Sequence, residues 1–197
     1  RFTDKVCIVT GGASGIGAKT AEMFAEQGGK VLIGDLDDKL GENVSAEINS
    51  KFGPACATYM HFDVTNPDDC KAAVDRTVDE FGGVHCVLNS AVKMAPGFLK
   101  DLSLEDWNTM VTVGLTGTFL MTQAAGRWMI ENGVHGSMVF VSSTGGLQPY
   151  GQAGAYSTVK AGIIMLAQHF AIEWGDHKVR VNSVCPGHTE TPLTAYL

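Results

Sequence analysis

Three side chains in the second half of the chain have the types and spacing needed for proton transfer. Tyr156 and Lys160 are four residues apart, so on a helix their side chains would lie next to each other on one face. A free tyrosine has a pKa of about 10, and a neighbouring ammonium group favours the phenolate, which makes the tyrosine a better base. The short apolar run over 136–143 predicts a buried strand that delivers Ser143 at its C-terminal end. Although a Tyr-x-x-x-Lys pair alone is more often a surface contact, we interpret Ser143, Tyr156 and Lys160 as candidate catalytic residues.

A glycine-rich turn near the N-terminus predicts a binding site for a cofactor. The turn Thr10–Gly17 follows one predicted strand and opens a helix, and its glycines allow the backbone to approach a pyrophosphate at the helix N-terminus. Asp35 ends the second predicted strand. Counted from the glycine turn, its position is close to the roughly 20 residues expected for the carboxylate that accepts ribose hydroxyls in a dinucleotide site. A carboxylate there repels a 2′-phosphate, and the turn carries Ser14 rather than a cation. The sequence therefore predicts NAD rather than NADP.

The candidate residues need a regular scaffold, and the sequence alternates strand-like and helix-like segments throughout. Predicted strands cover 5–10, 30–35, 55–62, 84–89, 136–143 and 179–184, and predicted helices cover 16–27, 37–52, 67–81, 103–131 and the segment around Tyr156. This alternation predicts the α/β class, with a doubly wound parallel sheet of six strands, right-handed crossovers and helices on both faces. Because no linker interrupts the pattern, we predict one dinucleotide-binding domain over 1–197.

Composition argues against several other classes of protein. The 197 residues, of which 45% are hydrophobic, suffice for one globular domain with a sizeable core. The net charge of −7 and the absence of a basic run argue against nucleic acid as a partner. No apolar run is long enough to span a bilayer and no signal-peptide pattern is visible, so we expect no membrane partner and a cytoplasmic location. The five scattered cysteines and six histidines form no metal-ligand spacing, so we expect reduced thiols and no metal.

With the glycine turn, Asp35, Ser143, Tyr156 and Lys160 in this order, the chain resembles the short-chain dehydrogenase/reductase superfamily, whose members have a Rossmann fold. The resemblance implies an oxidoreductase that transfers a hydride between NAD and a small or medium secondary alcohol or ketone. It also implies that Tyr156 exchanges a proton with the substrate oxygen, that Ser143 hydrogen-bonds this oxygen, and that Lys160 lowers the tyrosine pKa and holds the nicotinamide ribose.

The resemblance extends to further turns along the chain. An Asp-Val pair after the third strand is expected to contact adenine. A Pro-Gly pair after the sixth strand is expected to flank the nicotinamide, and the threonines just beyond it are expected to bind the nicotinamide amide or the phosphates. The predicted cofactor-binding residues, in addition to Asp35, Tyr156 and Lys160, are Gly11, Ser14, Gly15, Ile16, Gly17, Asp63, Val64, Asn89, Ala91, Pro186, Gly187, Thr189 and Thr191.

The chain departs from the family pattern at three places. Val92 replaces the glycine of the N-N-A-G motif, and Gly114 replaces the asparagine of V-N-L-x-G, which in the family holds a water of a proton relay. Family members also continue beyond the position of Leu197 into a seventh strand, so we expect the domain to be C-terminally incomplete. Because glycine leaves room for an extra water, we expect slowed proton transfer rather than lost chemistry, and a higher kcat for Gly114→Asn. The alternative is a catalytically impaired NAD-binding sensor or scaffold of the same fold.

Two further expectations concern the substrate and assembly. The expected substrate pocket is mostly apolar and is lined by Met94, Leu147, Gln148, Tyr150, His188, Leu193 and Tyr196, although His188 is more simply explained as a solvated loop residue. The helices predicted over 103–131 and around Tyr156 carry apolar residues on more than one face, for instance Leu115, Phe119, Trp128, Ile164, Leu166 and Phe170. We therefore expect a homodimer or homotetramer.

Overall fold

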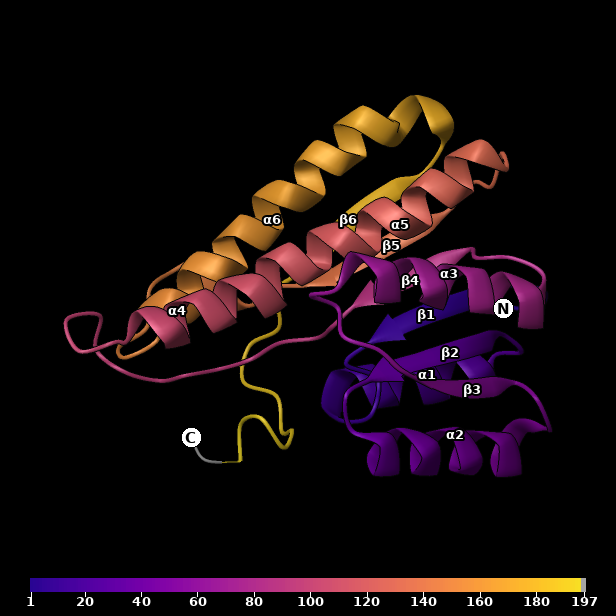
Figure 1. Cartoon of the computed structure of the whole chain (residues 1–197), viewed down its shortest axis with the longest axis horizontal. Coiled ribbons are helices and arrows are strands. Elements are labelled where there is room, and N and C mark those ends of the chain that lie inside the picture. The colour runs from indigo at the N-terminus through magenta and orange to yellow at the C-terminus, as the bar shows by residue number, and fades with distance from the viewer. Residues whose placement is uncertain (196–197) are drawn as a thin grey trace.

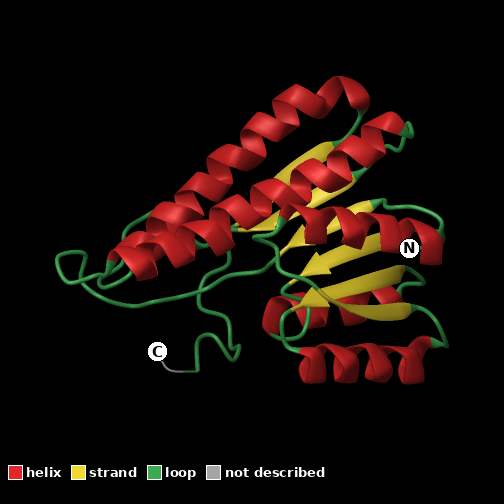
Figure 2. Ribbon diagram, viewed as in Figure 1, coloured by secondary structure: helices red, strands yellow, loops and turns green. Residues whose placement is uncertain are grey.

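A parallel six-stranded sheet organises the computed structural model, which describes residues 1–195 (Figures 1 and 2). The strands are β1 (Val6–Thr10), β2 (Lys30–Asp35), β3 (Ala57–His61), β4 (Cys86–Asn89), β5 (Ser137–Val141) and β6 (Arg180–Val184). Their order in the sheet is β3-β2-β1-β4-β5-β6. The order reverses between β1 and β4, and open parallel sheets bind ligands beyond the carboxyl ends of the strands at such a point.

Helices cover both faces of the sheet (Figure 2). They are α1 (Gly15–Glu26), α2 (Asp38–Phe52), α3 (Pro67–Phe81), α4 (Leu104–Met110), α5 (Gly117–Glu131) and α6 (Gly154–Trp174), with a π-helical turn η1 (Val111–Thr116) and 3₁₀ turns η2 (Thr144–Gly146) and η3 (Gly175–His177). Successive side chains of a strand point to opposite faces of the sheet. In β1, Ile8 packs among α3, α5 and α6, whereas Cys7 and Val9 pack among α1 and α2. The predicted α/β fold with a doubly wound parallel sheet is therefore confirmed.

Several predicted element boundaries were wrong by a few residues. The strand predicted over 55–62 spans Ala57–His61, the strand predicted over 84–89 spans Cys86–Asn89, and the strand predicted over 136–143 spans Ser137–Val141. The hydrophobic pattern extends beyond the hydrogen-bonded ladder because residues that follow a strand are also buried; Phe62, for example, is buried just after β3. As a result, Ser143 lies beyond β5, where it caps the turn η2.

The helix predicted over 103–131 is not one continuous α-helix. A π-helical turn, Val111–Thr116, separates α4 from α5, and Gly114 lies inside it. A π turn inserts an extra residue into a helix and widens it locally, which hydrophobic periodicity does not reveal. The three segments still run on as one long rod beside α6 (Figure 1).

Within residues 1–195, none of the helices combines the length and the apolar character that crossing a lipid bilayer would require. In the same part of the chain, no group of three or more His, Cys, Asp or Glu side chains is arranged to hold a metal ion.

Candidate active site

The turn between β1 and α1 borders a cavity of about 470 Å³ at the carboxyl ends of the strands. Gly11 and Gly15 have φ values of 62° and 53°, in the left-handed region that favours glycine. A Cβ atom on Gly11 would lie 2.8 Å from the Ala91 backbone, so the turn packs directly against the segment after β4. The side chain of Ser14, the N-cap of α1, makes no capping hydrogen bond. The backbone N–H groups of the first helical turn thus remain available for an anion such as a pyrophosphate, and the site fits a dinucleotide.

Most of the predicted cofactor residues line this one cavity. They are Gly11, Ser14, Gly15, Ile16, Asp35, Asp63, Val64, Ala91, Tyr156, Lys160, Pro186, Gly187, Thr189 and Thr191. Gly17 and Asn89 do not line it. Gly17 packs under the turn, and the buried Asn89 donates from Nδ2 to Thr122 Oγ1 at 3.0 Å. These two residues could therefore act only by shaping the wall of the cavity.

Backbone amides fix the orientation of the Asp35 carboxylate. Its two oxygens accept hydrogen bonds from the N–H groups of Ala13 at 3.0 Å, Leu36 at 2.8 Å and Asp37 at 3.2 Å. Asp37 in turn caps α2 by accepting from the N–H of Leu40 at 3.0 Å. Three hydrogen bonds to the charged form hold the carboxylate where a ribose could reach it.

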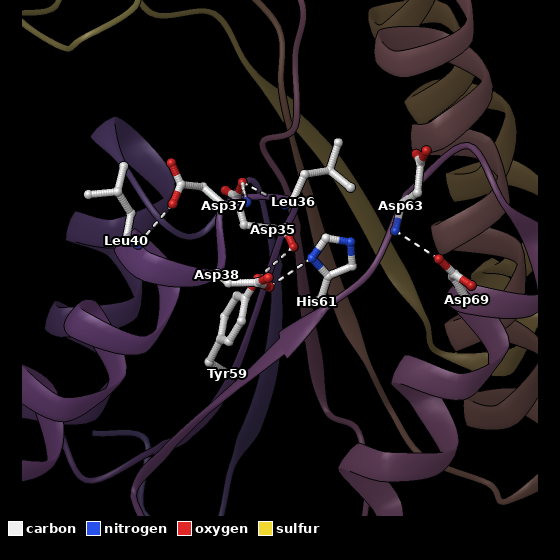
Figure 3. A network of polar contacts seen from close by, with 9 residues as sticks. All are labelled: Asp35, Leu36, Asp37, Asp38, Leu40, Tyr59, His61, Asp63 and Asp69. Atoms are coloured by element: carbon white, nitrogen blue, oxygen red, sulfur yellow. Dashed lines mark hydrogen bonds and ion pairs between the residues drawn. The ribbon is translucent and has the colours of Figure 1, made fainter.

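Two side chains of β3 that sequence reasoning missed buttress the Asp35 turn (Figure 3). His61 Nδ1 lies 2.8 Å from Asp38 Oδ1, and the Tyr59 hydroxyl lies 2.8 Å from the same oxygen and 3.0 Å from the Asp35 carbonyl oxygen. Hydrogen bonds from Tyr59 and His61 lower the pKa of Asp38, whereas burial and the neighbouring carboxylates raise the pKa of Tyr59. In the pairing of β2 with β3, His61 lies opposite Asp35, and its imidazole can form a cation. Asp38 already contacts this imidazole.

The predicted adenine end of the cavity is also acidic. Asp63 accepts a hydrogen bond from the Thr65 N–H at 2.8 Å, and its own N–H donates to Asp69 at 2.9 Å (Figure 3). The adjacent Val64 is buried against Gly117, where a Cβ atom would lie 2.6 Å from a Val64 methyl group. Asp63 and Val64 are thus held in place by contacts with two different helices, α3 and α5.

The structure brings Ser143 and Tyr156 together. From the position that a Cβ atom on Gly145 would occupy, Ser143 Oγ, Tyr156 Cε1 and Tyr150 Cδ2 are each 3.4 Å away. Ser143 Oγ accepts a hydrogen bond from the Gly145 N–H at 3.0 Å, which fixes its position at the start of η2. Tyr156 lies in the first turn of α6 and lines the cavity, as Ser143 does.

Lys160 lies one turn further along α6 and is almost completely buried, with 3% of its surface exposed. Its ammonium nitrogen donates to the Val141 carbonyl oxygen at 2.6 Å and lies 5.5 Å from the centre of the Tyr156 ring. Burial lowers the pKa of Lys160 to about 8. The ammonium group therefore lies beside the Tyr156 ring, and its burial has a cost in desolvation.

We expect the stability difference between Lys160→Met and the natural protein to change with pH. The lysine pKa falls from 10.5 to about 8 on folding. At pH values between these two numbers, the lysine is mostly protonated in the unfolded chain and mostly neutral in the folded one. The natural protein therefore gains stability as the pH rises through this range. Below pH 8 the cost of burying the ammonium is fully present. The advantage of the Met variant should therefore shrink by about 3 kcal/mol between pH 8 and pH 10.5.

Urea unfolding of both proteins across this pH range measures the difference. Lys39→Met, at an exposed lysine of α2, is the matched control, and its difference from the natural protein should stay nearly constant. A pH-independent difference for Lys160→Met would contradict the burial of a titrating ammonium group.

The structure changes the expectation for Gly114. A Cβ atom at this position would lie 2.6 Å from Val159 Cγ1, so the room expected for an extra water is filled by a buried valine. Val159 directly precedes Lys160 on α6. The Gly114 carbonyl oxygen is also engaged, because it accepts a hydrogen bond from Thr118 Oγ1 at 2.6 Å. A larger residue at position 114 must displace Val159 or push the π turn away from α6.

We therefore expect Gly114→Asn alone to destabilise the protein by about 1–3 kcal/mol, through overpacking. Only in the Val159→Ala background, where the space is free, do we expect Gly114→Asn to be tolerated and to raise kcat. A double-mutant cycle of unfolding free energies should give a favourable coupling of at least about 1 kcal/mol. Additive effects of the two substitutions would show that these side chains do not compete for space.

The other departure, Val92, lies in the segment that follows β4. The segment that carries it is fixed because Thr10 Oγ1 accepts hydrogen bonds from the N–H groups of Ser90 at 3.1 Å and Ala91 at 3.2 Å. Val92 lines the same cavity as Ser143. Its branched side chain therefore narrows the cavity where the family has a glycine.

The expected substrate-lining residues are only partly found at the cavity. Leu193 lines it, whereas Met94, Leu147, Gln148, Tyr150 and His188 do not, and Tyr196 lies outside the described residues. Lining residues that sequence reasoning missed include Leu36, Phe62, Val113, Pro192 and Thr194. The position of Leu36 and Phe62 directly after β2 and β3 could have identified those two, because side chains that follow parallel strands gather at one edge of the sheet.

Comparison with known proteins places these features in a wider context. A family model described as short chain dehydrogenase matches residues 5–197. Over 195 residues the chain is 38% identical to a 2,5-dichloro-2,5-cyclohexadiene-1,4-diol dehydrogenase of Sphingobium indicum, with 99% of this chain and 77% of the relative covered. It is 37% identical over 197 residues to a 3-alpha-(or 20-beta)-hydroxysteroid dehydrogenase of Mycobacterium tuberculosis, with 100% and 74% covered.

A solved structure shares the fold as well. The crystal structure of an NAD⁺-bound xylitol dehydrogenase superposes with a TM-score of 0.90 at 30% identity, and the match covers 95% of this chain and 71% of that one. The xylitol dehydrogenase thus shares with this chain both recognisable sequence and the arrangement of the sheet.

Proposed function

The chain belongs to the short-chain dehydrogenase family, and on that premise we propose that it transfers a hydride between NAD and a secondary alcohol or ketone. The observation that carries the proposal is that Ser143, Tyr156 and the buried Lys160 line the same cavity as Asp35 and the glycine turn. A proton donor and acceptor therefore lies within reach of a site that fits a dinucleotide. We also propose that residues 1–197 act as one dinucleotide-binding domain.

In this proposal the residues of the chain divide the work between binding and proton transfer. NAD, when bound, would supply the hydride chemistry at its nicotinamide ring. The N-terminus of α1 and the glycine turn would hold its pyrophosphate, and Asp35 would accept hydrogen bonds from the adenosine ribose. Pro186, Gly187 and Thr189 would flank the nicotinamide, and Thr191, which lies beside Gly15 of the glycine turn, would contact the phosphates.

The proton moves at the phenolic oxygen of Tyr156. In alcohol oxidation Tyr156 takes the hydroxyl proton as the hydride leaves the carbinol carbon, and in ketone reduction it returns that proton. Ser143 Oγ is fixed by the Gly145 N–H and donates its own proton toward the substrate oxygen. The Lys160 ammonium stabilises the phenolate form of Tyr156, because the two groups are close and water is largely excluded from the lysine.

The names of the relatives suggest a substrate class. The two relatives near 38% identity are named for a cyclohexadiene diol and for 3-alpha- or 20-beta-hydroxysteroids, and both names describe hydroxylated compounds that contain rings. The structural relative at 30% identity is named for xylitol, which is an open-chain polyol. We propose a cyclic secondary alcohol or the corresponding ketone as the substrate of this protein.

The experiment that tests the function uses the protein with NAD and a panel of cyclic and open-chain secondary alcohols. Appearance of the reduced cofactor, followed by its absorbance, is the expected result. The rival hypothesis, a sensor or scaffold that binds NAD without turnover, draws support from Val92, which lines the cavity, and from Gly114, which packs against Val159. Tight NAD binding with no turnover of any alcohol or ketone would favour the sensor or scaffold hypothesis and contradict the proposed enzyme activity.

We expect NAD to bind at least about tenfold more tightly than NADP, which corresponds to about 1.4 kcal/mol of repulsion. Within residues 1–195, His61 is aligned with Asp35 in the sheet, and its ring is engaged by Asp38. Titration with each cofactor measures the preference, and Asp35→Ser should reduce it. Asp37→Ser, which removes a neighbouring charge and keeps a residue suited to capping α2, is the control and should keep the preference. Equal or tighter binding of NADP to the natural protein would overturn this prediction.

We further propose a homodimer or homotetramer assembled through α5 and α6. Of the residues that suggested this, Phe170 is buried and packs against Trp174, so it belongs to the core instead. Met165 and Ile172 are exposed on α6 and supply apolar surface. Light scattering at micromolar concentration tests this, and a monomeric mass would contradict it.

A cytoplasmic location is also proposed, because the five cysteines are free, as in proteins of reducing compartments.

A further inference from the structure

A second carboxylate lies close to the one that is proposed to bind the ribose. Asp38 begins α2, three residues after Asp35, and its side chain contacts β3 (Figure 3). Asp38 Oδ1 lies 2.8 Å from the Tyr59 hydroxyl and 2.8 Å from His61 Nδ1. The Tyr59 hydroxyl also lies 3.0 Å from the Asp35 carbonyl oxygen, so Asp38 and the end of β2 share one partner. The position of the Asp38 carboxylate relative to Asp35 is therefore fixed.

His61 lies directly behind the wall of the cavity. It is opposite Asp35 in the pairing of β2 with β3, and the next two residues of the chain, Phe62 and Asp63, line the cavity. Neither His61 nor Asp38 is among the lining residues, and 56% and 65% of their side chains are exposed. A charge at this place can still act on a bound nucleotide, because the field of an exposed charge extends over about 8–10 Å at ordinary ionic strength.

The groups around His61 carry mostly negative charge. The charged and titratable residues of the adjoining segments are Asp35, Asp37, Asp38, Lys39, Tyr59, Asp63, Asp69 and Arg76. Arg76 reaches β3 at Thr58 and pairs with Glu80 at 3.6 Å. Hydrogen bonds from Tyr59 and His61 lower the pKa of Asp38, so this carboxylate stays charged in mild acid. A protonated His61 would therefore form a pair with Asp38 that has no net charge.

We propose that His61 is a specificity-determining residue, because its protonation sets how strongly the acidic turn after β2 repels the 2′-phosphate of NADP. The proposal deepens the proposed function and rests on nucleotide binding at Asp35. NAD has a hydroxyl group at the 2′ position and is nearly indifferent to this charge, whereas NADP has a phosphate there. Histidine is the residue type that changes its charge between about pH 5 and pH 8, so the preference for NAD should weaken on acidification.

The test compares the natural protein with His61→Asn, because the Asn amide can donate a hydrogen bond to Asp38 without carrying a charge. Calorimetric titration gives the dissociation constants of NAD and NADP at about pH 8 and about pH 5.5. At the higher pH we expect the two proteins to match for both cofactors. At the lower pH the natural protein should bind NADP about threefold more tightly than the variant, and NAD equally well. The 2′-phosphate also gains a proton over this range, with a pKa of about 6, but it does so with both proteins.

Three controls separate the charge of His61 from a structural role. In about 0.5 M salt the difference for NADP should shrink, because exposed charges are screened, whereas a structural effect would persist. Asp38→Asn removes the negative charge permanently, so it should tighten NADP binding already at the higher pH. His135→Gln changes an exposed histidine just before β5, outside the cavity lining, and should behave as the natural protein at both pH values.

Two results would overturn the role of His61 while the proposed function stands. One is equal weakening of NAD and NADP binding in His61→Asn at both pH values, which would make His61 a structural residue only. The other is the same NADP affinity for the natural protein and His61→Asn at the lower pH. If the natural protein binds neither cofactor, the proposed function fails and the inference fails with it.

Discussion

Replacing Tyr156 by Phe is expected to lower kcat by roughly a thousandfold or more and to leave NAD affinity within a few-fold. A positioned general acid or base contributes about 10²- to 10⁴-fold, and the phenolic oxygen of Tyr156 is the group that exchanges the proton directly. The Phe variant keeps the ring that packs beside Gly145 and Lys160, so the cavity keeps its shape. The loss should therefore appear in the chemical step and not in cofactor binding.

Steady-state rates with the best alcohol of the panel, together with NAD titration, measure the two effects separately. Tyr150→Phe is a matched comparison because it removes a hydroxyl from a ring next to the same glycine, and it should cost no more than about tenfold, the scale of one or two ordinary hydrogen bonds. Turnover retained in Tyr156→Phe would mean that another group moves the proton. If the Gly114→Asn change made in the Val159→Ala background also leaves the rate unaltered, the relay hypothesis fails and the sensor or scaffold hypothesis gains.

Replacing Gly17 by Ala is expected to disrupt the cofactor site from behind. A Cβ atom on Gly17 would lie 2.1 Å from the Gly11 carbonyl oxygen and 3.1 Å from the Gly12 Cα, and these are backbone atoms that cannot rotate away. The turn must therefore shift as a unit, although Gly17 itself does not line the cavity. We expect a loss of about 1–3 kcal/mol of stability from overpacking and a fall of at least about tenfold in NAD affinity, because the N–H groups that face the anion move with the turn.

Chemical denaturation and NADH titration measure these two quantities on the same samples. Gly175→Ala is the matched control, since Gly175 has a helical φ of −57° and nothing lies within 4 Å of the added methyl group. Its stability should stay within about 0.5 kcal/mol of the natural value. Normal NAD affinity in a folded Gly17→Ala protein would show that the turn does not hold the dinucleotide.

The sequence by itself determined the class of the fold and the order of its elements. β1 and β2 are apolar runs, and their burial on both faces is visible as continuous hydrophobicity. The spacing of Tyr156 and Lys160 on one helix is a local property, fixed by 3.6 residues per turn. The positive φ values of Gly11 and Gly15 are local as well. Features that depend on neighbours in the chain could therefore be predicted from the sequence.

The tertiary structure decided which side chains from different elements meet. Val159 fills the space beside Gly114, Tyr59 and His61 brace the turn after Asp35, and the Val141 carbonyl holds Lys160. In each case the partners are separated by more than 15 residues, and their contact depends on how a helix packs on the sheet or on how two strands align. Periodicity specifies which face of an element is buried, but the shape of the space between two buried faces is set only when both are packed together.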